Sequence, residues 1–303
     1  MNPVLPNLLI VGSAKCGTSS LHNYLAQHPE IFMSSKKEPR FLSSQGMEFP
    51  LGGPKDHRVE KWIVKEYNDY LELFQGKSNF NIIGESSADT LYFYKHTITS
   101  IKKYIGNPKI LIVLRNPVKR SFSAYQHLVR DDRESLSFEE ALQLEDDRIK
   151  KNYELIYHYR SVSRYYEPVE AFLKNFDHVK IILTEHLNKK PEQTLKSVFE
   201  FLGVDPSYKI QDFETKFNMS GKPKSRWLHE FLFEGHPIRN FIRPFVRTIV
   251  PKEKRESMSL KIQQMNLTQM KINPDTEKML KIEFKDEIEK LERLLNINLD
   301  LWK

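Results

Sequence analysis

The stretch GSAKCGTSS, residues 12–20, reads like a glycine-rich phosphate-binding loop with its lysine displaced. In the common triphosphate loop, G-x-x-x-x-G-K-[ST], the lysine follows the second glycine and reaches the β and γ phosphates. Here Thr18 follows Gly17, and Lys15 lies inside the loop. A lysine in that place can neutralise charge that develops on a departing phosphate. The loop therefore predicts group transfer from a phosphate-containing donor.

Two features argue against ATP chemistry. The lysine after the second glycine is absent, and the neighbouring apolar runs end in Glu85 and Arg115, not in the aspartate that would hold magnesium. A site without this lysine and this magnesium ligand suits sulfuryl transfer better than phosphoryl transfer, because a sulfuryl group carries less negative charge that must be offset. A nucleotide or small-molecule kinase on the same scaffold stays the alternative.

The elements that would position this loop alternate between apolar runs and helical stretches. Residues 7–12 form an apolar run that leads through the loop into a helix-periodic stretch, and β-branched runs recur at 81–85, 109–115 and 179–185. Such alternation predicts an α/β, P-loop-NTPase-like three-layer fold with a central parallel sheet flanked by helices. Asn116 and Pro117 should open a helix, because asparagine caps N–H groups and proline has none to leave unsatisfied.

The rest of the chain shows no clear boundary. Residues 43–57 are rich in Gly and Pro and predict a loop, which either borders an acceptor site or is a plain surface connection. From about residue 207 the chain becomes basic and mostly helical, with an amphipathic stretch at 275–297. We expect a single domain over residues 1–303.

Composition narrows the class of protein. The 303 residues include 39% hydrophobic and 29% charged residues, which is typical of a globular protein. The net charge of +7, from 47 basic and 40 acidic residues, favours an anionic ligand. A single cysteine and the absence of a basic leader favour a cytoplasmic setting. No paired cysteines and no H-E-x-x-H motif occur, so we expect no metal.

Five stretches together resemble the sulfotransferase family that uses 3′-phosphoadenosine 5′-phosphosulfate (PAPS). They are LLIVGSAKCGTSSLHNYLAQHP, KKEPRFLS, ILIVLRNPVKRSFSAYQHLV, SRYYEPVEAFLKNF and VFEFLGV. The resemblance covers about residues 7–230 and is closest to the branch that sulfates sugars, including heparan-sulfate-type enzymes and their bacterial relatives.

The resemblance implies PAPS as co-substrate, PAP as product and a set of donor-binding residues. Lys15 would be the catalytic cation, and the 3′-phosphate would lie near Arg115 and Ser123. The residues implied to hold the 5′-phosphosulfate are Lys15, Cys16, Gly17, Thr18, Ser19 and Ser20. Helical spacing places Asn116, Arg120 and Ser123 on one face, which suits a phosphate beside Arg115.

A positioned carboxylate should accept the proton of the attacking hydroxyl. The resemblance favours Glu38 in KKEPRFLS, and Glu85, at the end of an apolar run, is the runner-up. The chain has Glu85-Ser86-Ser87 at a position where glycan-sulfating members of the family often have Glu-Lys. This difference argues against a heparan-like acceptor. His22 and His127 are expected to be ordinary helix residues and not bases.

Two basic segments each allow a functional and a purely structural interpretation. The stretch 221–227 resembles a loop that closes over the nucleotide, through Lys222, Lys224 and Arg226, although basic loops are often merely solvated. The stretch 238–249 has an apolar face that could contact a membrane surface or a partner, but such helices usually pack on their own core. The sequence predicts in-line sulfuryl transfer to a hydroxyl, on a sugar or glycan, with no nucleic-acid partner. The alternative acceptor is a lipid or another non-sugar hydroxyl.

Overall fold

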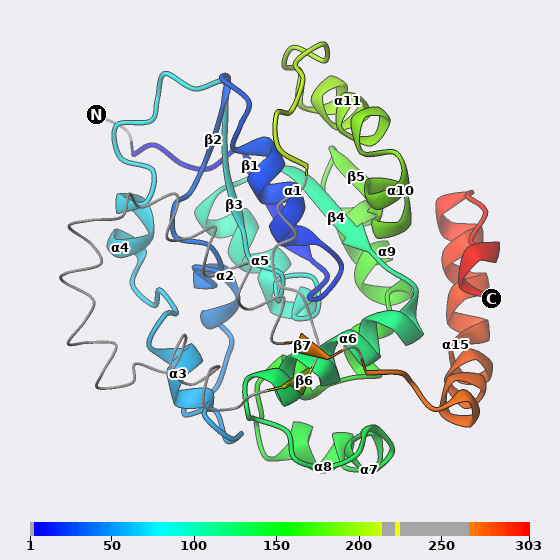
Figure 1. Cartoon of the computed structure of the whole chain (residues 1–303). Helices are drawn as coiled ribbons and strands as arrows, with labels where there is room; N and C mark the ends of the chain where they lie inside the picture. The colour runs from blue at the N-terminus through cyan, green and yellow to red at the C-terminus, as the bar shows by residue number, and fades with distance from the viewer. Residues whose placement is uncertain (1–2, 214–221, 225–266, 269) are drawn as a thin grey trace.

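A five-stranded parallel sheet forms the centre of the computed structural model, which describes residues 3–213, 222–224, 267–268 and 270–303. The strand order is β2-β3-β1-β4-β5 (Figure 1). The strands are β1 (Leu8–Gly12), β2 (Ile31–Met33), β3 (Ile82–Ser86), β4 (Lys109–Leu114) and β5 (Val179–Leu183). A short antiparallel pair, β6 (Lys222–Pro223) and β7 (Leu267–Thr268), lies apart from this sheet.

Helices connect and flank the strands. They are α1 (Thr18–Leu25), α2 (Phe41–Ser44), α3 (Asp56–Glu60), α4 (Tyr67–Glu72), α5 (Tyr94–Tyr104), α6 (Pro117–Arg130), α7 (Phe138–Gln143), α8 (Glu145–Lys150), α9 (Tyr166–Asn175), α10 (Thr184–Lys189), α11 (Pro191–Leu202) and α15 (Pro274–Leu295). Three 3₁₀ turns are η1 (Leu155–Tyr157), η2 (Ser161–Ser163) and η3 (Asp300–Trp302). In Figure 1, α1 crosses in front of the sheet, and α5 and α9 lie together behind it.

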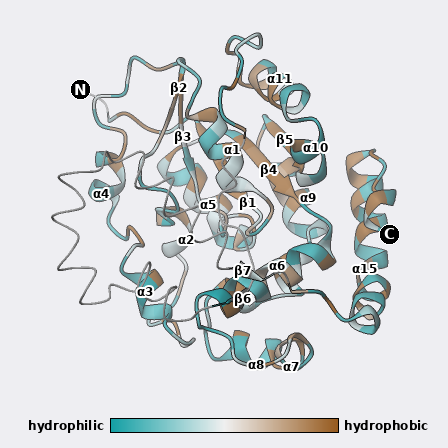
Figure 2. Ribbon diagram, viewed as in Figure 1, coloured by the Kyte–Doolittle hydropathy of each residue, from teal (hydrophilic) through white to brown (hydrophobic). Residues whose placement is uncertain are grey.

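Burial explains why the strands read as continuous apolar runs. Every residue of β1 is buried, as is every residue of β4 except Lys109. Parallel strands covered on both faces show this pattern, because neither face meets water. Figure 2 shows the hydrophobic residues concentrated along the central strands and the polar residues on the outer faces of the helices. The predicted parallel sheet flanked by helices is confirmed.

The predicted element boundaries agree closely with the structure. The four predicted strands are present, and their ends differ from β1, β3, β4 and β5 by at most two residues. The strand β2 was not predicted, because three residues give too short a pattern to stand out. The helix at 275–297 corresponds to α15, which buries an apolar stripe and packs against α6 and α9. The single domain stays a prediction.

The start of α6 is built as its sequence indicates. Pro117 is the first helical residue, and the Asn116 side chain accepts a hydrogen bond from the Lys119 N–H at 3.0 Å. The Asn116 amide also donates to the Trp302 carbonyl oxygen at 3.1 Å. The carboxyl end of β4 is thereby joined to the C-terminal turn η3.

The segment after β3 crosses the carboxyl end of β1. The Leu91 N–H donates to the Val11 carbonyl at 2.7 Å, and the Ser87 N–H donates to the Ile10 carbonyl at 3.1 Å. At Gly12, with φ of 148°, an added Cβ would lie 2.9 Å from the Ala88 carbonyl oxygen. Only glycine tolerates this close approach, which places the glycine-rich loop of residues 12–20 directly beside residues 88–91.

Candidate active site

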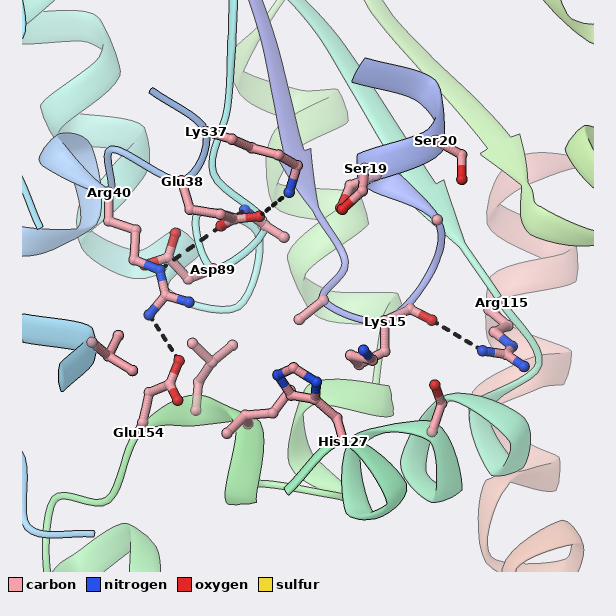
Figure 3. Close-up of a pocket in the computed structure, with 18 of the residues that line it drawn as sticks. Lys15, Ser19, Ser20, Lys37, Glu38, Arg40, Asp89, Arg115, His127 and Glu154 are labelled. Atoms are coloured by element: carbon pink, nitrogen blue, oxygen red, sulfur yellow. Dashed lines mark hydrogen bonds and ion pairs between the residues drawn. The ribbon is translucent and has the colours of Figure 1, made fainter. Parts of the chain in front are cut away.

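A cavity of about 430 Å³ opens at the carboxyl ends of the parallel strands (Figure 3). The segments that follow β1, β2, β3, β4 and β5 all contribute to its wall, together with residues 154–156 at η1. Ligands of open α/β sheets bind at this edge, because the loops that leave the strands converge there. The cavity is therefore the candidate active site. None of residues 43–57 lines it.

The loop between β1 and α1 is held rigidly against the ends of β4 and β5. The Thr184 hydroxyl lies 2.5 Å from the Cys16 carbonyl oxygen and 2.9 Å from the Leu114 carbonyl oxygen. Gly17 precedes α1 with φ of 94°, a left-handed conformation that suits glycine, and no side chain caps the helix. The first-turn N–H groups of a helix have no partner within the helix, so this N-terminus favours an anion.

Lys15 extends into the cavity (Figure 3). Burial and, next, the nearby guanidinium of Arg130 lower the pKa of its ammonium group to about 7, against the opposing effect of the Asp131 carboxylate. Among the described residues, this ammonium makes no hydrogen bond or ion pair. A partly buried cation without a direct partner is costly, so an anion bound here would be stabilised.

The predicted 3′-phosphate residues line the same cavity. Arg115 follows β4 and donates to the Lys15 carbonyl oxygen at 3.2 Å, and Ser123 lies two turns into α6. Thr184 and Asn188 of α10 also line this part of the wall. Sequence analysis missed both, although they follow a strand that it had identified.

The side chains of two residues expected near the phosphates, Arg120 and Cys16, do not line the cavity. Arg120 is fully buried and does not line the cavity; its guanidinium donates to three backbone carbonyls in two segments, that of Ala14 in the loop and those of His158 and Tyr159. It therefore ties the loop to the chain around η2. Cys16 is buried as well, and its Sγ lies 3.6 Å from the Tyr165 hydroxyl. Burial raises the pKa of its thiol.

Glu38 lies on the opposite wall, in the segment between β2 and α2. Its carboxylate accepts from the Ala88 N–H at 2.9 Å and from the Lys37 ammonium at 3.0 Å, and the Arg40 guanidinium lies 3.8 Å away. Burial alone would raise the pKa of Glu38, but Lys37 and Arg40 outweigh it and lower the pKa below its usual value. The carboxylate is thus ionised at neutral pH and faces the cavity.

Glu85, the alternative base, occupies a different environment. It is 2% exposed within β3, does not line the cavity, and accepts a hydrogen bond from the Ser87 hydroxyl at 2.9 Å. Burial raises the pKa of Glu85 to about 8, so this carboxyl is mostly protonated at neutral pH. Placement and charge both favour Glu38, and the identity of the base stays a prediction.

The two histidines also differ in placement. His127 lines the cavity near Lys15, and the Arg130 guanidinium lies 2.7 Å from its Nδ1. Burial, with Lys15 and Arg130, holds the pKa of His127 well below its usual value. His22 does not line the cavity, and burial lowers its pKa to about 4. Both rings are therefore neutral at pH 7.

A ladder of buried charges, which sequence analysis did not anticipate, supports the Glu38 wall. Glu154 is buried and bridges two arginines, at 2.8 Å from Arg40 and 2.8 Å from Arg133. Arg133 also contacts Asp56 at the start of α3. Arg40 and Asp56 are both more than 90 positions before Glu154 in the sequence, so no local pattern could have revealed the ladder.

The remaining basic residues fall at the limit of the described chain. Lys224 is exposed, the Lys222 side chain and Arg226 lie outside the described residues, and so does the stretch 238–249. Over the described ranges, no helix is long and apolar enough to cross a membrane. The same ranges hold no group of three or more His, Cys, Asp or Glu side chains placed to bind a metal.

Comparisons with known proteins agree on one family. The model of the sulfotransferase family matches residues 6–208. A crystal structure of a sulfotransferase from Alicyclobacillus acidocaldarius is 32% identical, with 99% of each chain covered and a TM-score of 0.78.

Two curated relatives are more distant. Human carbohydrate sulfotransferase 15 is 26% identical over 80% of this chain and 52% of its own length. The bifunctional heparan sulfate N-deacetylase/N-sulfotransferase 1 of Caenorhabditis briggsae is 25% identical over 76% of this chain and 26% of its own length. The chain thus spans about half the first relative and a quarter of the second.

The charge ladder should dominate local stability. Replacing Glu154 by Gln removes the carboxylate that Arg40 and Arg133 share, while Arg40 keeps Glu38 and Arg133 keeps Asp56, so the free energy of unfolding should fall by roughly 1.5–3 kcal/mol. Glu167→Gln, at an exposed position, should change it by less than about 0.5 kcal/mol. Urea denaturation measures both. Equal stability of the two variants would show that the ladder does not stabilise this wall.

Proposed function

The chain belongs to the sulfotransferase family, a family of PAPS-dependent transferases, and we propose that it moves the sulfuryl group of PAPS to a hydroxyl of a sugar or glycan. One observation carries the proposal: a partly buried Lys15 ammonium and an ionised Glu38 carboxylate line the same cavity. The first suits a departing phosphate, and the second suits an arriving hydroxyl.

The donor would bind across the strand ends. The N-terminus of α1 offers backbone N–H groups and a positive dipole to the 5′-phosphosulfate, with Thr18, Ser19 and Ser20 in its first turn. Arg115 and Ser123 would hold the 3′-phosphate, and their position on the same wall supports this assignment. Lys224 and Arg226 keep their proposed role in closing over the nucleotide.

The proposed reaction is a single displacement at sulfur. The acceptor oxygen attacks sulfur and forms the new O–S bond, while the bond from sulfur to the bridging oxygen of the donor breaks and leaves PAP. The proton of the acceptor hydroxyl passes to the Glu38 carboxylate. Lys15 stabilises the negative charge that grows on the departing phosphate. The two groups act on opposite ends of the transferred sulfuryl group.

A sugar acceptor is supported by the names of the curated relatives and by the character of the cavity wall. Val59, Leu155 and Ile156 add an apolar surface beside Glu38 and Arg40. A sugar ring has both apolar C–H faces and polar edges, which suits such a mixed wall. The same apolar side chains would also accept a lipid or another non-sugar hydroxyl, which remains the second candidate. The family argues against the kinase alternative, and a cytoplasmic location remains a prediction.

The donor role of Lys15 can be tested with labelled PAPS, without divalent metal, against sugars, lipids and phenols as acceptors. Lys15→Ala should reduce turnover about 10²- to 10³-fold, because it removes one preorganised charge from the transition state. Lys119→Ala, an exposed neighbour on α6, is the control and should keep full activity. A Lys15→Ala variant with normal turnover would rule out the assigned role.

The identity of the base can be tested by comparing two conservative variants. Glu38→Gln should lower kcat about 10²- to 10⁴-fold, since the amide cannot accept the hydroxyl proton. Glu85→Gln should change kcat much less, because that carboxyl already carries a proton at neutral pH. Steady-state kinetics with the best acceptor measures both, and the reverse ranking would assign the base to Glu85.

A further inference from the structure

A second cavity lies beside the active site, between the end of β2 and α4. Its volume is about 790 Å³, within the range of ~300–1,000 Å³ that is common for ligand pockets. We call it the outer groove. Its polar lining residues are Ser35, Lys36, Lys61, Asp69, Glu72, Gln75 and Lys77. Figure 1 shows α3 and α4 on the β2 side of the sheet, and the groove is lined by residues of β2 and α4.

The outer groove is continuous with the active-site wall through two shared segments. In the first segment, Lys37 and Glu38 line the active site while Lys36 lines the groove. In the second, Val59 lines the active site and Lys61 lines the groove. The Val64 N–H donates to the Pro39 carbonyl at 2.9 Å, which fastens the two segments together. A long acceptor that leaves the active site on this side therefore meets the groove.

Trp62 belongs to the second of these shared segments, between residues that line the two cavities. It lies between Lys61 and Ile63, both of which line the groove, and 71% of its surface is exposed. Among the described residues, the other exposed large hydrophobic side chains are aliphatic. Ile63 is buried, so the segment that carries the indole is anchored. Exposing an indole costs free energy that a flat apolar ligand surface would recover.

We propose that the outer groove binds the sugar units of a linear glycan acceptor next to the unit being sulfated, with one ring stacked on Trp62. This inference rests on the proposed function. Sugar hydroxyls both donate and accept hydrogen bonds, and the groove offers ammonium donors, carboxylate acceptors and an amide. Among the described residues, the Lys36, Lys61 and Asp69 side chains form no ion pair with one another or with a neighbour, which leaves them available to a ligand.

The test compares short and long acceptors of two kinds. Unsulfated chondroitin provides an acidic disaccharide and hexasaccharide, and maltose with maltohexaose provides the neutral counterparts. In the series that is sulfated, Trp62→Ala should raise the KM of the hexasaccharide about 10-fold, as loss of an aromatic anchor does. The KM of the disaccharide and both kcat values should change by less than about twofold.

Two controls separate stacking from loss of fold. Trp62→Phe keeps an aromatic face and should restore most of the hexasaccharide KM. Ile282→Ala removes a similarly exposed apolar side chain, 69% exposed on α15, and should leave both KM values unchanged. Equal effects of Trp62→Ala on short and long acceptors would overturn the proposal, as would no effect on either.

A direct binding measurement covers the case in which neither series is sulfated. That outcome counts against the sugar acceptor of the proposed function, and tryptophan fluorescence then tests the outer groove itself. Titration with either hexasaccharide should shift the emission of the wild-type protein and not that of Trp62→Phe. If neither hexasaccharide produces a shift that depends on Trp62, the groove does not bind glycans.

Discussion

The architecture of the site depends on one unfavourable arrangement: a partly buried lysine ammonium near three arginines, whose repulsion the single nearby carboxylate of Asp131 only partly offsets. Burial and the positive charge of Arg130, Arg115 and Arg120 together lower the pKa of Lys15. The fold maintains this arrangement through the Thr184 contacts to the loop and the close packing at Gly12. An anion that enters relieves the repulsion, so the site is preorganised for phosphate before any donor arrives.

The acceptor wall follows the opposite principle, because each charge there is paired. Lys37 and Arg40 hold Glu38 ionised, and Glu154 joins Arg40 to Arg133. The pairing fixes the carboxylate in position and keeps it ionised, and the lower pKa makes it a weaker base than a free glutamate. The cavity thus combines an unpaired cation on the donor side with a paired anion on the acceptor side. This asymmetry matches a reaction in which negative charge leaves at one end and a proton leaves at the other.

Sequence analysis predicted the sheet, the loop and part of the cavity wall because these depend on local patterns. Apolar runs that end in Gly12 or Arg115 place those residues at one edge of the sheet whatever the rest of the chain does. The Arg40–Glu154–Arg133 ladder could not be predicted, since it joins distant segments. Helical spacing also misplaced Arg120, because spacing gives the face of a helix and not the neighbour that covers it. Likewise, the ranking of Glu38 over Glu85 gained its physical reason only from burial.

Calorimetry of PAP binding tests the central claim about Lys15 most directly. At pH 8 a lysine with a pKa of about 7 is mostly neutral, so binding of an anionic phosphate should take up about one proton. Titrations in buffers of different ionisation enthalpy measure that uptake, and PAP affinity should fall as the pH rises above about 7. Lys15→Ala should abolish the uptake. Tight PAP binding with no proton uptake in the wild-type protein would contradict the account.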